Sequence, residues 1–408
     1  MNNSVKILLV TLMTLSMPFH ANAQFLKNLL KTVGEVVSNS SSSESGSSSY
    51  SRYSSPVSSS GRTKIPAIVF SNPSATKSYA RSEGSIGTEA PDQRVPVKIG
   101  YDERVFSKDY AGNSFDFVIT NKLSNTVTIY AIRGTKDNIE FPTTVEWKGK
   151  KYLVVTIGPN AIGSSVTGLV FPKGLKRIGY QAFNGCYRMP STVRIPSSVT
   201  TIDAHAFSEC QKLKSVYIPA SVTSIGYAPF YKCNELEEII VAEDNPNYKS
   251  VNGVLYNKEM TEVIQYPGGK LTKSYTAPSS VVSINREAFA GNYNLNMVVL
   301  PYGVRFLSVS AFNNARINDV ILPPSIEEIG NAALGLESVS ISGVPSKAHI
   351  IITANKPPKA HADALNHYRT SFKADAEIYV QKGTRSDYLS ISPWSSAENI
   401  IETEFVKK

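Results

Sequence analysis

The chain has 408 residues, and its 42 Lys and Arg outnumber its 33 Asp and Glu to give a net charge of +9. The basic residues are scattered without a block or stripe, which argues against nucleic acid as a partner and leaves a soluble basic surface with some affinity for acidic partners. After residue 23 no segment reaches the roughly 20 apolar residues of a membrane helix, so stable insertion in a membrane is not expected.

The first 23 residues are predicted to be a secretory signal peptide. Lys6 gives a positive start, residues 7–19 form a short apolar run, and residues 21–23 (ANA) supply a small-residue cleavage pattern. No cysteine follows the predicted cut before Gln24, so a lipoprotein anchor is not expected. The sequence therefore predicts an exported protein that lies at the cell surface or outside the cell, with the periplasm as the alternative.

Residues 24–95 are predicted to hold a short amphipathic segment and then a disordered tether. Apolar residues recur at helical spacing between Leu26 and Val37. This helix either touches a membrane or a partner, or is only a frayed helix before a linker. From Ser38 to Ser60, 15 of 23 residues are Ser. Such a composition buries too little apolar surface to offset the entropy of ordering, which predicts a flexible tether.

Order is expected from about residue 96. Residues 114–132 alternate polar and apolar side chains, and residues 146–152 (EWKGKKY) are typical of a hairpin turn between two strands. The first coil of a stacked array would expose unpaired backbone groups and apolar side chains, so a dedicated cap is needed there. Residues 96–153 are therefore predicted to form an N-terminal β cap.

A repeat with a period of about 23 residues occupies residues 154–343. Each copy places Phe or Leu at a corner, and successive corner positions lie 24, 23, 59, 23 and 22 residues apart. These positions are Phe183, Phe207, Phe230, Phe289, Phe312 and Leu334. Short strands with period-2 apolar residues, ended by Pro, run in phase with them. A unit this short buries its apolar face only by stacking on its neighbours. The predicted fold class is therefore mostly β, a solenoid of about eight coils.

The gap of 59 residues is predicted to hold one full coil and an insertion at about residues 242–277. Within it, Asn252-Gly253 between two apolar stretches is a strong signal for a two-residue hairpin. Residues 263–267 and 274–278 resemble repeat strands, so the insertion is expected to add a coil as well. After about Gly343 the repeat is expected to fail, and residues 344–408 are predicted to form a C-terminal cap that packs Tyr388 and Trp394 on the last coil.

Three cysteines occupy one position in three consecutive coils, each three residues after the corner Phe. They are Cys186, Cys210 and Cys233. Side chains on adjacent parallel strands keep their β-carbons about 4.8 Å apart, whereas a relaxed disulfide needs roughly 3.5–4.5 Å and converging bonds. Three thiols in a flat row also do not make a tetrahedral metal site. We therefore expect three buried free thiols.

Two coils match one known repeat almost letter for letter: residues 197–219 (SSVTTIDAHAFSECQKLKSVYIP) and residues 220–241 (ASVTSIGYAPFYKCNELEEIIV). The pattern resembles the BspA-like leucine-rich repeats of bacterial surface proteins, and residues 244–258 and 376–383 are also typical of that family. The resemblance covers roughly residues 156–394 and implies a leucine-rich-repeat solenoid. It further implies a cell-surface role in adhesion and binding of host proteins, with no single catalytic activity. Late copies depart from the pattern at Asn292, Leu307, Ala315 and Leu334.

Motifs for catalysis, phosphate binding and metal binding are not evident in the sequence, and no cofactor is expected. His205 occupies a variable corner position and is expected to be exposed. His361, Asp363 and His367 are expected to lie on a surface loop rather than in a metal site. Residues 244–247 (DNPN) only partly match a calcium loop, because Pro246 stands at a ligand position. Carboxylates that folding brings together keep a polysaccharide-degrading, glycosidase-like enzyme, or an accessory component of one, open as an alternative.

The candidate binding surface is the outward row of the strand face, two residues before each strand Pro. Its members are Val170, Arg194, Tyr217, Val299 and Ile321. The row is more apolar than a solvated face needs, and stacking would align it into one stripe. Strand propensity alone is the competing interpretation of its β-branched members. The function predicted is a non-catalytic, adhesin-like protein that binds a host matrix or surface protein, or a glycan, through this row. The insertion hairpin around Asn252-Gly253 is the next candidate, and the oligomeric state is not predicted.

Overall fold

The computed structural model describes residues 105–134, 137–163, 166–337, 339–341, 344–367, 376–397 and 399–405. The expected signal peptide (1–23) and the amphipathic segment and tether (24–95) lie outside these residues. One compact unit spans residues 73–401. Apart from the end of its last strand, the architecture described here belongs to residues 73–401. Strands dominate it, as the repeat predicts.

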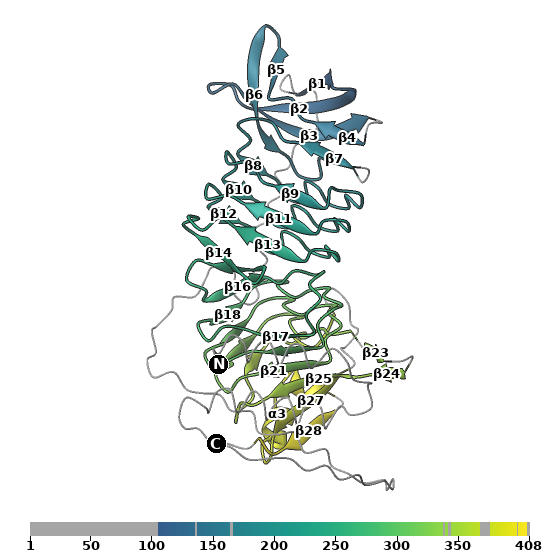
Figure 1. Ribbon diagram of the computed structural model, residues 1–408. Coiled ribbons are helices and arrows are strands. Elements are labelled where there is room, and N and C mark those ends of the chain that lie inside the picture. The colour runs from purple at the N-terminus through teal and green to yellow at the C-terminus, as the bar shows by residue number, and fades with distance from the viewer. Residues whose placement is uncertain are drawn as a thin grey trace, which may run out of the picture. The chain divides into compact units, whose positions relative to one another are not determined.

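One sheet joins the N-terminal strands to the first coils (Figure 1). Its first three strands run antiparallel, and the remaining strands of the main path add in parallel. In spatial order they are β1 (Val105–Tyr110), β2 (Asn113–Asn121), β3 (Thr126–Gly134), β6 (Lys150–Ile157), β8 (Arg177–Ile178), β10 (Thr201–Ile202) and β12 (Ser224–Ile225). Beside them, β5 (Thr144–Trp147) pairs with β6 through a turn in which Lys148 and Gly149 both have positive φ. The boundary expected at residue 153 falls inside β6, so the N-terminal strands share hydrogen bonds with the first coil.

The strand face of the first coils is made of two smaller parallel sheets (Figure 1). The first pairs β4 (Asn138–Glu140) with β7 (Gly168–Val170). The second places β11 (Ser215–Ile218) between β9 (Thr192–Arg194) and β13 (Glu238–Val241). In each of these coils a short strand of the first sheet therefore alternates with a strand of this face.

From the insertion onward the same two ladders resume as separate sheets (Figure 1). One contains, in order, β14 (Tyr248–Val251), β15 (Val254–Asn257), β16 (Glu262–Gln265), β18 (Ser283–Ile284), β20 (Phe306–Leu307), β22 (Glu328–Ile329) and β26 (Lys359–Ala360). The other contains β17 (Ser274–Thr276), β19 (Met297–Val299), β21 (Asp319–Leu322), β25 (Ala348–Ile352), β27 (Ala376–Gln381) and β28 (Ile400–Thr403). The hairpin β23 (Val339–Ile341)–β24 (Val344–Ser346), the short helix α3 (Arg385–Leu389) and the 3₁₀ turn η1 (Trp394–Ser396) complete the described elements.

The corner phenylalanines form stacked columns inside the array. Phe183 and Phe207 stack with ring centroids 5.0 Å apart, and Phe207 and Phe230 follow at 5.7 Å. Phe289 and Phe312 repeat the stack at 4.9 Å. All five rings are buried. Because burying one such side chain is worth roughly 1.5–3 kcal/mol, these columns are a main source of cohesion between coils that have no core of their own.

Each coil turns its corner through the left-handed backbone region two residues before the corner Phe or Leu. The residues there have φ between +43° and +57° and are Gln181, His205, Ala228, Glu287, Ser310 and Ala332. None of them is Gly, which is the residue that adopts this conformation at least cost. The backbone conformation of the corner is the same in these coils, whereas the residue type at this position differs from coil to coil.

The insertion forms a layer that both halves of the array share. Asn252 (φ +50°) and Gly253 (φ +78°) close the hairpin β14–β15, which confirms the predicted turn. Along β15 and β16, Leu255 and Ile264 join the core of the first coils, while Val254 and Val263 join the core of the later ones. Successive residues of a strand point to opposite faces. One face of this layer therefore packs in the first core and the other face packs in the second core.

The three cysteine side chains are buried and free, as predicted. Each Sγ donates a hydrogen bond to a backbone carbonyl of the preceding coil: Cys186 to Gly163 (3.5 Å), Cys210 to Phe183 (3.3 Å) and Cys233 to Phe207 (3.0 Å). Burial, together with the neighbouring thiols, raises the pKa of Cys210 well above its ordinary value. Asn292, at the same position in a later coil, donates its amide to Pro267 and so keeps the buried donor that Cys supplies elsewhere.

We expect thiol titration of the folded protein to find almost no reactive groups, because all three thiols are buried away from a reagent in solution. Unfolding without a reductant should release all 3 thiols. A count of one after unfolding would mean that two of the cysteines form a disulfide, which would contradict the described packing.

The repeat continues past Gly343, where the sequence analysis expects it to fail. β21, β25 and β27 pair in parallel in one ladder, and β22 pairs with β26 in the other. Ladder pairing uses backbone groups, so coils whose side-chain motif has drifted still stack. Tyr388 and Trp394 do pack on this last part, as expected: both are fully buried, and Trp394 Nε1 donates to the carbonyl of Pro358 (3.3 Å).

Candidate functional site

The predicted strand-face row is present but divided. Arg194 and Tyr217 are direct partners on β9 and β11, and Ile240 on β13 continues the row. Val170 lies on β7 in the neighbouring pair β4–β7, and Val299 lies on β19 in the sheet beyond the insertion. The insertion separates the sheets, so the row is not the single continuous stripe that stacking alone predicts.

The prediction that Ile321 belongs to the outward row is wrong, because this side chain is fully buried. Val320, Ile321 and Leu322 are all buried in β21, and the register partner Ile351 on β25 is buried as well. A strand that is covered on both faces carries a continuous apolar run instead of an alternating one. The stretch VIL in this strand is such a run.

Three neighbouring members of the row form the strand-face patch, defined as Arg194, Tyr217 and Ile240. The Arg194 guanidinium lies over the Tyr217 ring, 5.2 Å from its centroid. Ile240 is 37 % exposed. Ile240 was not predicted as a member of the row, because members were identified by the Pro that ends each strand. Ala242 stands in place of that Pro after β13. The patch therefore offers a cation, an aromatic ring and an aliphatic side chain side by side.

The expectation that His205 is exposed is also wrong, because its side chain is only 12 % exposed. Its Nε2 lies 3.0 Å from Oε2 of Glu287, whose Oε1 lies 3.4 Å from Nε of Arg286. Arg286 in turn covers the ring of Tyr227, 4.3 Å from its centroid. This ionic cluster ties coils on opposite sides of the insertion together.

The charge of Glu287 depends on its two partners. Burial alone would raise the pKa of this carboxyl group, but the hydrogen bond and charge of His205, with the charge of Arg286, outweigh it and lower the pKa below its ordinary value. The pairing therefore favours the ionised carboxylate in the folded protein. We interpret the cluster as stabilising rather than ligand-binding, because its charged groups are paired with one another.

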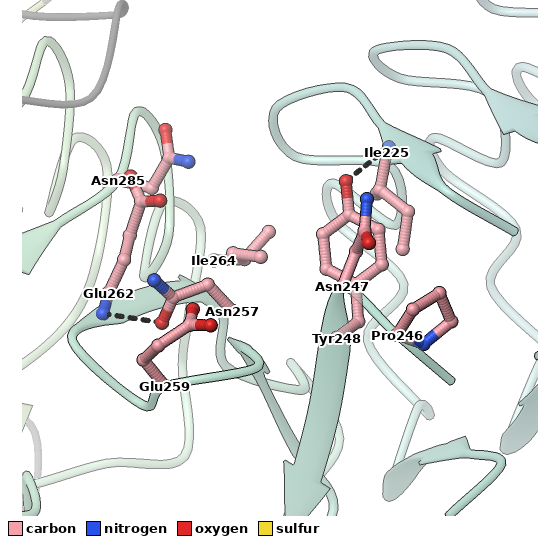
Figure 2. Close-up of a pocket in the computed structure, with 9 residues that line it drawn as sticks. All are labelled: Ile225, Pro246, Asn247, Tyr248, Asn257, Glu259, Glu262, Ile264 and Asn285. Carbon is pink, nitrogen blue, oxygen red and sulfur yellow. Dashed lines mark hydrogen bonds between the residues drawn. The ribbon is translucent and has the colours of Figure 1, made fainter. Parts of the chain in front are cut away.

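The insertion creates a cleft where the first array of short strands ends at β12 (Figure 2). The cavity has a volume of about 340 Å³. One wall carries Ile225, Pro246, Asn247 and Tyr248, the opposite wall carries Asn257, Glu259, Glu262 and Asn285, and Ile264 lies between them (Figure 2). Most of these side chains are polar. The hairpin was predicted from the sequence. The cleft was not predicted, because it depends on how the hairpin packs against the neighbouring coils.

Both walls of the cleft are held by amide side chains. The buried Asn245 donates to the carbonyls of Pro219 and Val222 and accepts from the backbone N–H groups of Asn247 and Tyr248, each at 2.9 Å. On the other wall, Asn257 Oδ1 accepts from the backbone N–H groups of Thr261 (2.8 Å) and Glu262 (2.9 Å). The cleft is therefore preorganised by satisfied hydrogen bonds.

Tyr248 stabilises the end of the first array. Its hydroxyl accepts a hydrogen bond of 2.7 Å from the backbone N–H of Ile225 on β12, the strand at which that sheet ends. Burial raises the pKa of Tyr248, and the Glu262 carboxylate across the cleft raises it further, against the bond from Ile225.

Three other acidic groups of the described coils are paired with basic side chains. Glu327 accepts two bonds of 2.7 Å from Arg305, and Glu235 and Glu337 pair with Lys212 and Arg316. Within the described ranges, no group of three His, Cys, Asp or Glu side chains is arranged to hold a metal ion.

His361 and Asp363 lie close together, with 3.7 Å between Nδ1 and Oδ2, while His367 contacts Asn314 instead. The described part of the chain also contains no helix that is both long and apolar enough to cross a membrane.

The repeat region matches the family described as the BspA type leucine rich repeat region, with 6 copies over residues 156–272 and 268–351. These residues carry the corner motifs and both ladders described above. The repeat region of this protein is a BspA-type leucine-rich-repeat array. No curated protein matches the chain.

Solved structures similar to this chain include a pneumococcal vaccine antigen and two leucine-rich proteins of bacteria. The pneumococcal vaccine antigen PcpA is 20% identical, with 74% of this chain and 99% of that one covered at a TM-score of 0.42. A leucine rich cell surface protein of Faecalibacterium prausnitzii is 21% identical, with 72% and 94% covered at 0.35. A leucine-rich repeat protein of Bacteroides ovatus is 18% identical, with 68% and 95% covered at 0.28.

Proposed function

We propose that this protein is exported to the bacterial cell surface, where its repeat array binds a host matrix or surface protein without catalysing a reaction. The observation that carries the proposal is the strand-face patch. Tyr and Arg are the residue types most often found as interface anchors, and here the guanidinium already lies over the ring. A side chain that is held before binding loses less entropy when the partner docks.

The repeat family and the predicted leader support the remaining parts of the proposal. Repeat arrays offer extended surfaces rather than deep pockets, and such surfaces suit protein partners. The signal-peptide pattern at residues 1–23 supports export, and the Ser-rich stretch at residues 38–60 supports a tether that lets the array search for a partner.

The double variant Arg194→Ala/Tyr217→Ala should weaken binding by roughly 2 kcal/mol or more, which is about 30-fold in Kd, because it removes both anchors. The measurement is surface plasmon resonance against a panel of purified extracellular-matrix proteins. Folding should be intact, since Arg194 is exposed and Tyr217 is only partly buried.

The matched control is Tyr187→Ala/Arg188→Ala, which removes the same residue types from another exposed part of the array. It should bind as the parent does. Equal binding by the parent and the patch variant would place the site elsewhere, and retention of polysaccharides alone would mean that the partner is a glycan.

A further inference from the structure

The cleft of the insertion differs from the strand-face patch in both shape and chemistry. It is a concave site of about 340 Å³, at the small end of the roughly 300–1,000 Å³ typical of ligand sites. Such sites are usually lined by apolar side chains, whereas this one is lined mainly by amides, carboxylates and a phenol. A polar lining of this kind complements a ligand that is covered with hydroxyl groups.

We propose that this cleft binds a neutral saccharide, with Tyr248 and Ile264 against a sugar ring and Glu259 and Glu262 accepting hydrogen bonds from its hydroxyls. The inference goes beyond protein docking at the strand-face patch, and it concerns a different site. Figure 2 shows the arrangement that supports it: Tyr248 with Asn247 on one side, the two glutamates with Asn285 on the other, and Ile264 between.

The hydrogen-bonding capacity of the cleft fits a polyol. An ionised carboxylate only accepts, and it forms stronger hydrogen bonds with hydroxyl donors than a neutral acceptor does. Asn247 and Asn285 add amide groups on opposite walls. The Tyr248 hydroxyl accepts from Ile225, and a hydroxyl that accepts a bond still has a proton to donate. The site therefore offers acceptors and donors to one ring.

The charge of the cleft selects against acidic ligands. Two carboxylates line one wall, and a uronic acid or a sulfated sugar placed between the walls would meet like charge. A metal ion fits less well, because Asn257 already uses its carbonyl oxygen on two backbone N–H groups. The net charge of +9 would attract acidic polysaccharides to the surface in general, but not to this cleft.

The preorganised walls support a binding site rather than an accidental gap. Asn245 fixes the segment that carries Asn247 and Tyr248, and Lys258 Nζ donates to the carbonyls of Glu243 (3.1 Å) and Asn245 (2.5 Å). Lys258 belongs to the turn that carries Glu259, so it links the two walls directly. A ligand that enters this cleft meets groups that are already in place, which lowers the entropy cost of binding.

The test is affinity electrophoresis with neutral polysaccharides (glucan, mannan, xylan and galactan) and acidic ones (polygalacturonate and alginate), followed by titration calorimetry with oligosaccharides of any glycan retained. The variant is Glu259→Gln/Glu262→Gln, which keeps side-chain shape and the backbone bonds to Asn257. We expect retention by at least one neutral polysaccharide and a loss of at least about tenfold in affinity in the variant, because two charge-assisted bonds are weakened.

The control Glu238→Gln changes one carboxylate on the strand face and should leave glycan binding unchanged. Failure of every neutral polysaccharide to bind would overturn the proposal, as would equal binding by the cleft variant. Retention of acidic polysaccharides only would also overturn it. If the cleft variant instead weakens binding of a matrix protein, the cleft takes a peptide and the saccharide assignment is wrong. The patch variant Arg194→Ala/Tyr217→Ala should retain glycan binding, which separates this proposal from the protein-docking function.

Discussion

Replacing Glu287 by Ala should destabilise the protein by about 3–5 kcal/mol, the usual cost of breaking a buried ion pair by removing one partner. Arg286 (13 % exposed) and His205 (12 % exposed) would lose the carboxylate between them and remain largely out of water. The loss should appear as a lower midpoint in urea unfolding followed by circular dichroism. The control Glu327→Ala removes an ion pair that is largely exposed and should cost about 0–1 kcal/mol.

The same pair predicts how stability depends on pH. The pKa of Glu287 is lower in the folded protein than the roughly 4.3 of an unfolded glutamate. Its contribution is therefore complete above that value and is lost as the pH falls through the folded pKa. Between about pH 5 and pH 3 the parent should lose more stability than Glu287→Ala does. Parallel curves for the two proteins over this range, or equal costs for Glu287→Ala and Glu327→Ala, would contradict the assignment of the cluster.

Replacing Phe207 by Ala should also cost about 3–5 kcal/mol, the range for large-to-small changes in a well-packed core. Phe207 is fully buried and stacks on both Phe183 and Phe230, so the change leaves a cavity in the middle of a column. Because this column belongs to the first of the two cores, amide hydrogen exchange should accelerate most in β9 and β11 and least in β19 and β21.

Leu123→Ala is the control for this second change, because Leu123 is 98 % exposed. Surface changes of this kind fall within about 0.5 kcal/mol of the parent. A cost for Phe207→Ala as small as that of Leu123→Ala would mean that the phenylalanine columns do not hold the coils together. Uniform acceleration of exchange across β9, β11, β19 and β21 would show that the two cores open as one.

The solenoid was predictable because its signal is local and repeated. The corner Phe, the alternating strand and the terminal Pro recur in most coils. A period near 23 residues is too short for a separate core, so the apolar side chains are buried by stacking coil on coil. The turn at Asn252-Gly253 was equally local. The extent of the array past Gly343 was not predictable, since β25 and β27 pair through their backbones after the side-chain motif has drifted.

The exposed site residues could be predicted only where side chains along one strand alternate between the core and the solvent. Arg194 and Tyr217 follow from that rule, but Ile321 does not, because a strand covered on both faces no longer alternates between core and solvent. The contact between His205 and Glu287 depends on the packing of coils that are far apart in the sequence. The cleft beside Tyr248 has the same origin. Such sites arise from tertiary packing, which a repeat motif does not encode.

The most direct test of the central claim, that this array binds and does not catalyse, is one experiment with two readings. The purified protein is incubated with the panel of matrix proteins and polysaccharides, and both the retained fraction and the release of new reducing ends or peptide fragments are measured over hours. We expect retention on at least one member of the panel, weaker retention of a patch or cleft variant, and no product. Sustained release of product, or no retention on any member, would contradict this claim.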